Sequence, residues 1–133
     1  MKEKTVETTI YIAKDGKEFK NKEQCEIYDK CLTNLYESTI YALKSENKNF
    51  EDVKYVKYCG EYYTTIEQFL EVAKNIYYDC EYGGVEINQT ILIVGFNWWL
   101  ERNEYDGSEW WEYKEMPSRD CCTLKDITKS EIL

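Results

Sequence analysis

The sequence predicts one α+β domain: two β-hairpin–helix units followed by a C-terminal antiparallel β-hairpin, with the helices packed on an antiparallel sheet. Turn signals, Asp-Gly or Gly-Glu, divide the chain into three β-containing segments at 15–16, 60–61 and 106–107. A helix-capping residue follows each of the first two, whereas the third continues as alternating apolar and polar residues. At 133 residues the chain fits a single domain, which we place at 1–117, followed by a polar C-terminal tail at 118–133.

The first unit is expected at 6–46. Its strands flank Asp15 and Gly16, a pair suited to a two-residue turn because both positions adopt a positive φ. Asn21 follows as an N-cap, with Gln24 at the third helical position. Apolar residues then recur at three- and four-residue spacing, which predicts one helix that frays near Ser45. They are Cys25, Tyr28, Leu32, Leu35, Thr39 and Leu43.

The second unit, expected at 50–82, follows the same plan. A β-prone stretch at 53–59 turns at Gly60, returns at 62–63 and leads into a helix that is capped by Thr65. The apolar stripe of this helix contains Phe69, Val72, Ala73 and Ile76. A shift of 44 residues superimposes the turn and the cap of the first unit on those of the second. Whether this similarity reflects a true repeat stays open.

The third segment, at 85–116, is expected to contain only strands. Val85 and Ile87 alternate with polar residues, and the run from 91 to 100 is interpreted as one long strand with Gly95 as a bulge. Asp106 and Gly107 form the next turn, after which 108–115 returns as the second strand of an antiparallel hairpin.

Two registers are open for this last hairpin. A two-residue turn places Arg102 opposite Trp111, where the guanidinium can stack on the indole, but it also places Glu104 opposite Glu109. A three-residue loop would pair Arg102 with Glu112 instead. In the two-residue register one face is expected to lie in the core, with Phe96, Trp98, Leu100, Trp111 and Tyr113.

Large aromatic and acidic side chains share the rest of this hairpin, which is the candidate partner-binding site. Acidity is local, because residues 79–115 carry nine acids and two bases in a chain of net charge −9. Aromatic anchors dominate binding hot spots, and surrounding carboxylates attract a basic partner. The alternative is that this face is buried against the mate of a homodimer, with the acids serving solubility. The expected site residues are Trp99, Glu101, Arg102, Glu104, Tyr105, Asp106, Glu109, Trp110 and Glu112.

Composition argues against several kinds of chemistry. The chain has no His, no G-x-S-x-G and no nucleotide-binding loop, so we expect no enzymatic activity, no metal site and no cofactor. Its six Cys follow no secretory signal and are expected to stay reduced in the cytoplasm of a host cell. The local negative charge argues against direct binding to nucleic acid or to an anionic membrane.

The segment WWLERNEYDGSEWWEY at 98–113, with the Asp-Gly hairpin that leads into a capped helix, resembles small acidic uncharacterised phage and prophage proteins of low-GC Gram-positive bacteria. The resemblance implies an anti-defence role, as in anti-CRISPR proteins that occupy the nucleic-acid channel of a nuclease. We therefore expect a non-enzymatic inhibitor that binds a basic host defence protein, such as a CRISPR effector, with carboxylates standing in for phosphates. The alternatives are a small-molecule binder that sequesters a nucleotide immune signal, and a structural or accessory phage protein.

Overall fold

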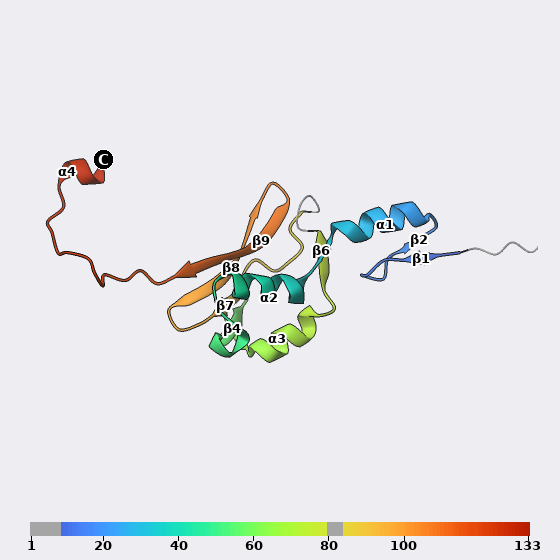
Figure 1. Cartoon of the computed structure of the whole chain (residues 1–133), viewed down its shortest axis with the longest axis horizontal. Helices are drawn as coiled ribbons and strands as arrows, with labels where there is room; N and C mark the ends of the chain where they lie inside the picture. The colour runs from blue at the N-terminus through green and yellow to red at the C-terminus, as the bar shows by residue number, and fades with distance from the viewer. Residues whose placement is uncertain (1–8, 80–83) are drawn as a thin grey trace, which may run out of the picture.

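The structure of the protein, a computed structural model, describes residues 9–79 and 84–133. It is mixed α+β with antiparallel sheets, which confirms the predicted α+β class. The main sheet consists of β4 (Tyr55–Tyr58), β5 (Tyr62–Thr64), β7 (Leu92–Val94), β8 (Trp98–Tyr105) and β9 (Ser108–Glu115). All neighbours are antiparallel, in the order β5-β4-β7-β8-β9. Helices α2 (Leu35–Ser45) and α3 (Ile66–Ala73) lie on one side of this sheet (Figure 1).

The main core lies between these two helices and one face of the sheet. Leu43 of α2 and Leu70 of α3 pack with Val56, Ile93 and Leu100, and all five are buried. Each strand contributes alternate residues, because successive side chains of a strand point to opposite faces. A second buried cluster contains Leu35, Ala73, Tyr78 and Ile87. The opposite face of the sheet therefore carries the residues between these core positions.

The N-terminal segment forms a small hairpin and helix that lie to one side of the main sheet (Figure 1). The elements are β1 (Tyr11–Ile12), β2 (Glu18–Phe19) and α1 (Lys22–Cys31). The predicted two-residue turn is wrong here, because Ile12 pairs with Glu18 across a loop at 13–17 in which Gly16, but not Asp15, has a positive φ. Asn21 caps α1 as predicted, because its side chain accepts a hydrogen bond from the amide of Gln24 at 3.0 Å. The rings of Phe19 and Tyr28 lie 5.1 Å apart between β2 and α1, and Cys25 is buried. This segment thus has apolar contacts of its own.

Tyr28 of α1 is expected to make the free energy of unfolding depend on pH in the alkaline range. Its hydroxyl donates a hydrogen bond to the carboxylate of Asp15, and this bond together with burial raises the pKa of Tyr28 to about 12. The pKa of an unfolded tyrosine is about 10. The stabilisation is therefore complete below pH ~10 and is lost as the pH rises towards the folded pKa. An NMR titration should show the Tyr28 ring ionising near pH 12.

The variant Tyr28→Phe should lose this component, so its free energy of unfolding should fall less steeply than that of the wild type at alkaline pH. Tyr41→Phe is the matched control, since Tyr41 is 75% exposed on α2. Ionisation of Tyr28 near pH ~10 in the folded protein, as in an unfolded chain, would contradict the expected role of Asp15.

The single helix predicted for the first unit is wrong at 32–34, because the chain forms two helices separated by a strand. Between α1 and α2, β3 (Leu32–Asn34) pairs antiparallel with β6 (Tyr77–Asp79). Asn34 caps α2 by accepting a hydrogen bond from the amide of Glu37 at 3.0 Å, and it donates one to the carbonyl of Lys74 at 2.9 Å. Asparagine favours caps over helix interiors, and the distant strand supplies the backbone partners.

The single long strand expected at 91–100 is also wrong, because β7 and β8 form a tight hairpin there. The amide of Gly95 donates to the carbonyl of Trp98 at 2.8 Å, and Asn97 has a φ of 136°. Gly95 is therefore a turn residue, and its lack of a side chain leaves room for the indole of Trp98. Phe96, which was expected in the core, lies in this turn and is 73% exposed. The reversal inserts β7 between β4 and β8.

The remaining segments are loops and short turns. Residues 84–91, where alternation predicted a strand, run without regular structure, and η1 (Phe50–Asp52) is a single 3-10 turn. Beyond β9 the chain leaves the sheet and ends in α4 (Lys129–Ile132) (Figure 1). Within 9–79 and 84–133, no helix is long and apolar enough to cross a membrane.

Candidate functional site

The hairpin of β8 and β9 has the two-residue register. Asp106 and Gly107 form its turn with φ values of 50° and 87°, as both central positions of this turn type require. Arg102 accordingly lies opposite Trp111, and Glu101 lies opposite Glu112. The three-residue alternative is thereby excluded, and the two faces of the hairpin are defined.

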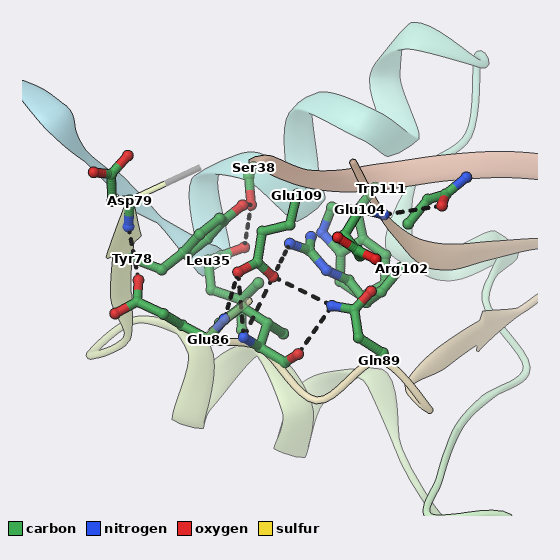
Figure 2. Close-up of polar contacts among 12 residues, drawn as sticks. Leu35, Ser38, Tyr78, Asp79, Glu86, Gln89, Arg102, Glu104, Glu109 and Trp111 are labelled. Carbon is green, nitrogen blue, oxygen red and sulfur yellow. Dashed lines mark hydrogen bonds and ion pairs between the residues drawn. The ribbon is translucent and has the colours of Figure 1, made fainter. Parts of the chain in front are cut away.

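A buried ion pair lies on the helix-facing side of this hairpin. Arg102 Nη2 and Glu109 Oε1 are 2.8 Å apart, and neither side chain is exposed to solvent (Figure 2). The guanidinium carbon of Arg102 lies over the rings of Trp111 and Tyr78, at 4.7 and 5.2 Å from their centres. Among the described residues, Nε and Nη1 of Arg102 have no hydrogen-bond partner. The carboxylate and the two rings are therefore the groups that stabilise this buried charge.

The carboxylate of Glu109 also holds the loop that precedes β7. It accepts hydrogen bonds from the amide of Glu86 at 2.7 Å, the amide of Ile87 at 3.3 Å and the side chain of Gln89 at 3.4 Å (Figure 2). Glu86 in turn accepts a bond from the amide of Asp79 in β6, at 2.9 Å. Glu109 thus connects the hairpin to the loop, and Glu86 connects the loop to a second sheet.

Arg102 and Glu109 were both expected at the partner-binding surface, and the structure buries them instead. In the observed register their side chains lie on the same face of the hairpin as those of Leu100 and Trp111, which face the helices. Opposite charges at diagonal positions on a core face neutralise each other there. Alternation along the strands was the sequence signal that could have identified them as a buried pair.

The seven other expected residues remain on the exposed side of the hairpin or at its turn. Tyr105 is 76% exposed and Trp110 is 39% exposed. Glu104 and Asp106 are exposed beside the turn. We use "open face" for the hairpin side chains that point away from α2 and α3, which are Trp99, Glu101, Asn103, Tyr105, Trp110, Glu112 and Lys114.

Polar contacts order the acids within the open face. The indole of Trp99 donates to Glu101 at 3.3 Å. Glu112 accepts a hydrogen bond from the side chain of Asn103 and lies 3.4 Å from the ammonium of Lys114. The bond from Asn103 is the main cause of a pKa of Glu112 below its usual value, with Lys114 contributing. Glu112 therefore stays charged, and its contacts with Asn103 and Lys114 offset the repulsion from Glu101 on the opposite strand.

The surface of the hairpin keeps the full negative charge of its sequence and has a single base. Residues 98–115 contain six acids and two bases. Burial of Arg102 against Glu109 removes one of each sign, which leaves five acids and Lys114 at the surface. A strongly acidic surface with large aromatic side chains is suited to a partner of opposite charge.

The sheet extends this surface beyond the expected residues. Leu92 and Val94 of β7 pair with Glu101 and Trp99, so they share the same side of the sheet, and both are half-buried. Tyr55 of β4 lies opposite Val94 and is 38% exposed. Sequence reasoning missed these residues because β7 and β4 were not expected to be neighbours.

Comparison of the chain with protein-family models, with curated proteins and with solved structures finds no match. Within the described parts of the chain, no three His, Cys, Asp or Glu side chains gather in a way that could hold a metal ion. The site is therefore interpreted from its own geometry, in which the exposed rings of Tyr105 and Trp110 lie on the same hairpin as the exposed acids.

Proposed function

We propose that the protein is a non-enzymatic binding module that holds a basic partner protein against the open face and the acidic turn of the β8–β9 hairpin. The observation that carries the proposal is the exposure of Tyr105 and Trp110 beside the exposed carboxylates of Glu104 and Asp106. Aromatic residues of this kind act as anchors in interfaces, and the carboxylates provide long-range attraction for a basic surface.

The buried ion pair supports the proposal because it fixes the hairpin before any partner arrives. Arg102 and Glu109 tie the two strands together below the turn, and Glu109 fixes the adjoining loop. A surface that is already ordered loses less conformational entropy when it binds. In this proposal the rest of the chain is scaffold, including the two hairpin–helix segments β1–β2–α1 and β4–β5–α3.

The specific form that we propose is a phage or prophage inhibitor of a nucleic-acid-handling defence protein, such as a CRISPR effector. A groove that binds nucleic acid is lined with Lys and Arg, which contact phosphates. The five surface acids of the hairpin provide carboxylates that such a groove can bind in place of phosphates. The aromatic rings of the hairpin can pack between the basic side chains of the groove.

Charge reversal at the turn should weaken partner binding. A photoreactive residue in place of Tyr105 first captures the partner from a host extract, with the same residue at Phe50 as the control position. The affinity of the purified partner is then measured for the double variant Glu104→Lys/Asp106→Lys at low and high salt. We expect a loss of roughly tenfold or more at low salt, and a weaker dependence on salt than in the wild type.

Glu18→Lys/Glu61→Lys is the matched control, because it changes the net charge equally at exposed acids outside the hairpin. It should change affinity by about twofold or less, since screened distant charges contribute little. Equal losses in both double variants would mean that only net charge matters. Cross-linking that is no more efficient from position 105 than from position 50 would place the binding site elsewhere.

A further inference from the structure

The edge of the main sheet at β9 is open to a further strand. β9 is the last strand in the sheet order, so only one of its sides is paired. The amide of Met116 donates to the carbonyl of Asn97 at 2.6 Å. Because the backbone groups of successive residues point to opposite sides of a strand, the amides and carbonyls of the even-numbered residues of β9 point towards β8. The amides and carbonyls of Glu109, Trp111 and Tyr113 therefore point outwards. None of the described residues bonds to these backbone groups.

A groove runs beside this edge, between β9 and α2. Its volume is about 310 Å³, and aromatic rings form much of its wall. Tyr41 contributes from α2, and Trp111 and Tyr113, which face the helices, contribute from β9. Glu46, the C-cap residue of α2, is exposed and brings a carboxylate to the groove.

The chemistry of the groove favours a cationic side chain. Its described lining contains the carboxylates of Glu46 and Glu109 and no Lys or Arg. Glu109 is already neutralised by Arg102, whereas Glu46 has no ion pair among the described residues. A long basic side chain can place its charge near Glu46 and over the aromatic rings, which attract cations. An anionic group would meet only like charge there.

We propose that the partner adds an extended basic segment to β9 as a sixth strand, with Lys or Arg side chains in the groove. This inference rests on the proposed function, because it takes the partner to be a basic protein, and it names how that partner binds. In strand addition the main chain supplies hydrogen bonds and alternate side chains supply specificity. Every second residue of the segment faces α2 and the groove, and the residues between them extend the open face.

The experiment uses the full chain and a short synthetic peptide in which arginine alternates with threonine. Backbone amides are followed by NMR, with and without the peptide. We expect the peptide to shift the amides of Glu109, Trp111 and Tyr113 and to slow their hydrogen exchange. The amides between them, which already pair with β8, should change less. A twin peptide with glutamate in place of arginine, and a twin with N-methylated backbone amides, should each bind roughly tenfold more weakly or not at all.

The variant Glu46→Lys tests the groove itself. A lysine at the C-terminal end of a helix is compatible with the helix dipole, so the variant should fold normally. We expect it to weaken binding of the arginine peptide roughly tenfold. Glu61→Lys, which makes the same charge change at the opposite edge of the sheet, should have little effect.

Four results would overturn the inference. Shifts at Trp99 and Tyr105 without protection of the β9 amides would mean that a basic partner binds the open face only, and the proposed function would stand. Equal binding of the glutamate peptide would contradict both proposals. If the β9 amides were protected from exchange without peptide, and the double variant Leu124→Asp/Ile127→Asp lost this protection, the added strand would be the chain's own tail. Protection that rises with protein concentration would make it a second copy of the chain.

Discussion

Glu109→Gln is expected to lower the free energy of unfolding by about 3 kcal/mol or more, the largest effect of any single change proposed for this protein. The substitution keeps the size of the side chain and one acceptor oxygen, but it removes the charge that neutralises Arg102. Arg102 would then be a cation with 0% side-chain exposure whose Nε and Nη1 already have no hydrogen-bond partner among the described residues. Urea unfolding monitored by circular dichroism measures the loss.

The double variant Arg102→Met/Glu109→Gln identifies the cause. It removes both charges and retains an acceptor for the amides of Glu86 and Ile87, so it should recover most of the lost stability. Glu71→Gln is the surface control, because Glu71 pairs with Lys74 at 3.1 Å with both side chains exposed. It should cost about 0.5 kcal/mol or less. A loss below about 1 kcal/mol for Glu109→Gln would show that water reaches the buried pair.

Gly95→Ala is expected to cost about 3 kcal/mol, because the new methyl group would occupy space that the indole of Trp98 fills. Trp98 is 3% exposed, and its ring stacks on that of Tyr113 with 5.9 Å between centres. The indole cannot move aside without disturbing the main core. Unfolding in urea gives the stability, and near-ultraviolet circular dichroism should show a changed aromatic environment in the folded state.

Gly60→Ala separates this steric effect from the ordinary cost of replacing a glycine by alanine. Gly60 has a φ of 72° and nothing within 4 Å of an added side-chain carbon, so alanine there should cost only about 1 kcal/mol. If overlap with Trp98 is the cause, Gly95→Ala should add little in a Trp98→Leu background. Full additivity of the two substitutions would contradict the steric explanation.

The sequence was informative at several positions where a local rule determines the backbone, although the same rule failed at Asp15 and Gly16, where the strands are joined by a longer loop. Asp106 and Gly107 both adopt positive φ, as the two-residue turn requires, and this turn selects one of the two registers that the sequence left open. Asn21 and Thr65 cap α1 and α3 as expected, because a capping side chain bonds an amide three residues away. Such rules need no knowledge of distant contacts.

The errors arise where distant segments decide the local conformation. Leu32 continues a helical apolar pattern, yet its backbone pairs with Asp79 in a strand. The amide of Leu35 then donates to the carbonyl of Ile76 at 2.9 Å as α2 begins. No property of the sequence near Leu32 specifies these partners, because they lie more than forty residues away along the chain.

In the candidate site, too, the features set by local rules were predictable and those set by distant contacts were not. Alternation correctly separates Trp99 and Trp110 from Leu100 and Trp111, so most of the exposed hairpin side chains were predictable. The burial of Arg102 was not recognised, because charged residues are exposed unless a specific partner is present. That partner, Glu109, and the flanking ring of Tyr78 come together only in the folded chain.

The insertion of β7 between β4 and β8 makes the β8–β9 hairpin inseparable from the rest of the sheet. Excised as a peptide, 98–115 would lose the neighbouring strand, the loop amides held by Glu109, and Thr39, which accepts a hydrogen bond from the Trp111 indole at 3.0 Å. An isolated two-stranded hairpin is only marginally stable in water. Epitope mapping with fragments, or grafting of the hairpin onto another scaffold, would therefore present a different surface from the native one. The shortest stretch that retains all of these partners together with β3 runs from 32 to 116.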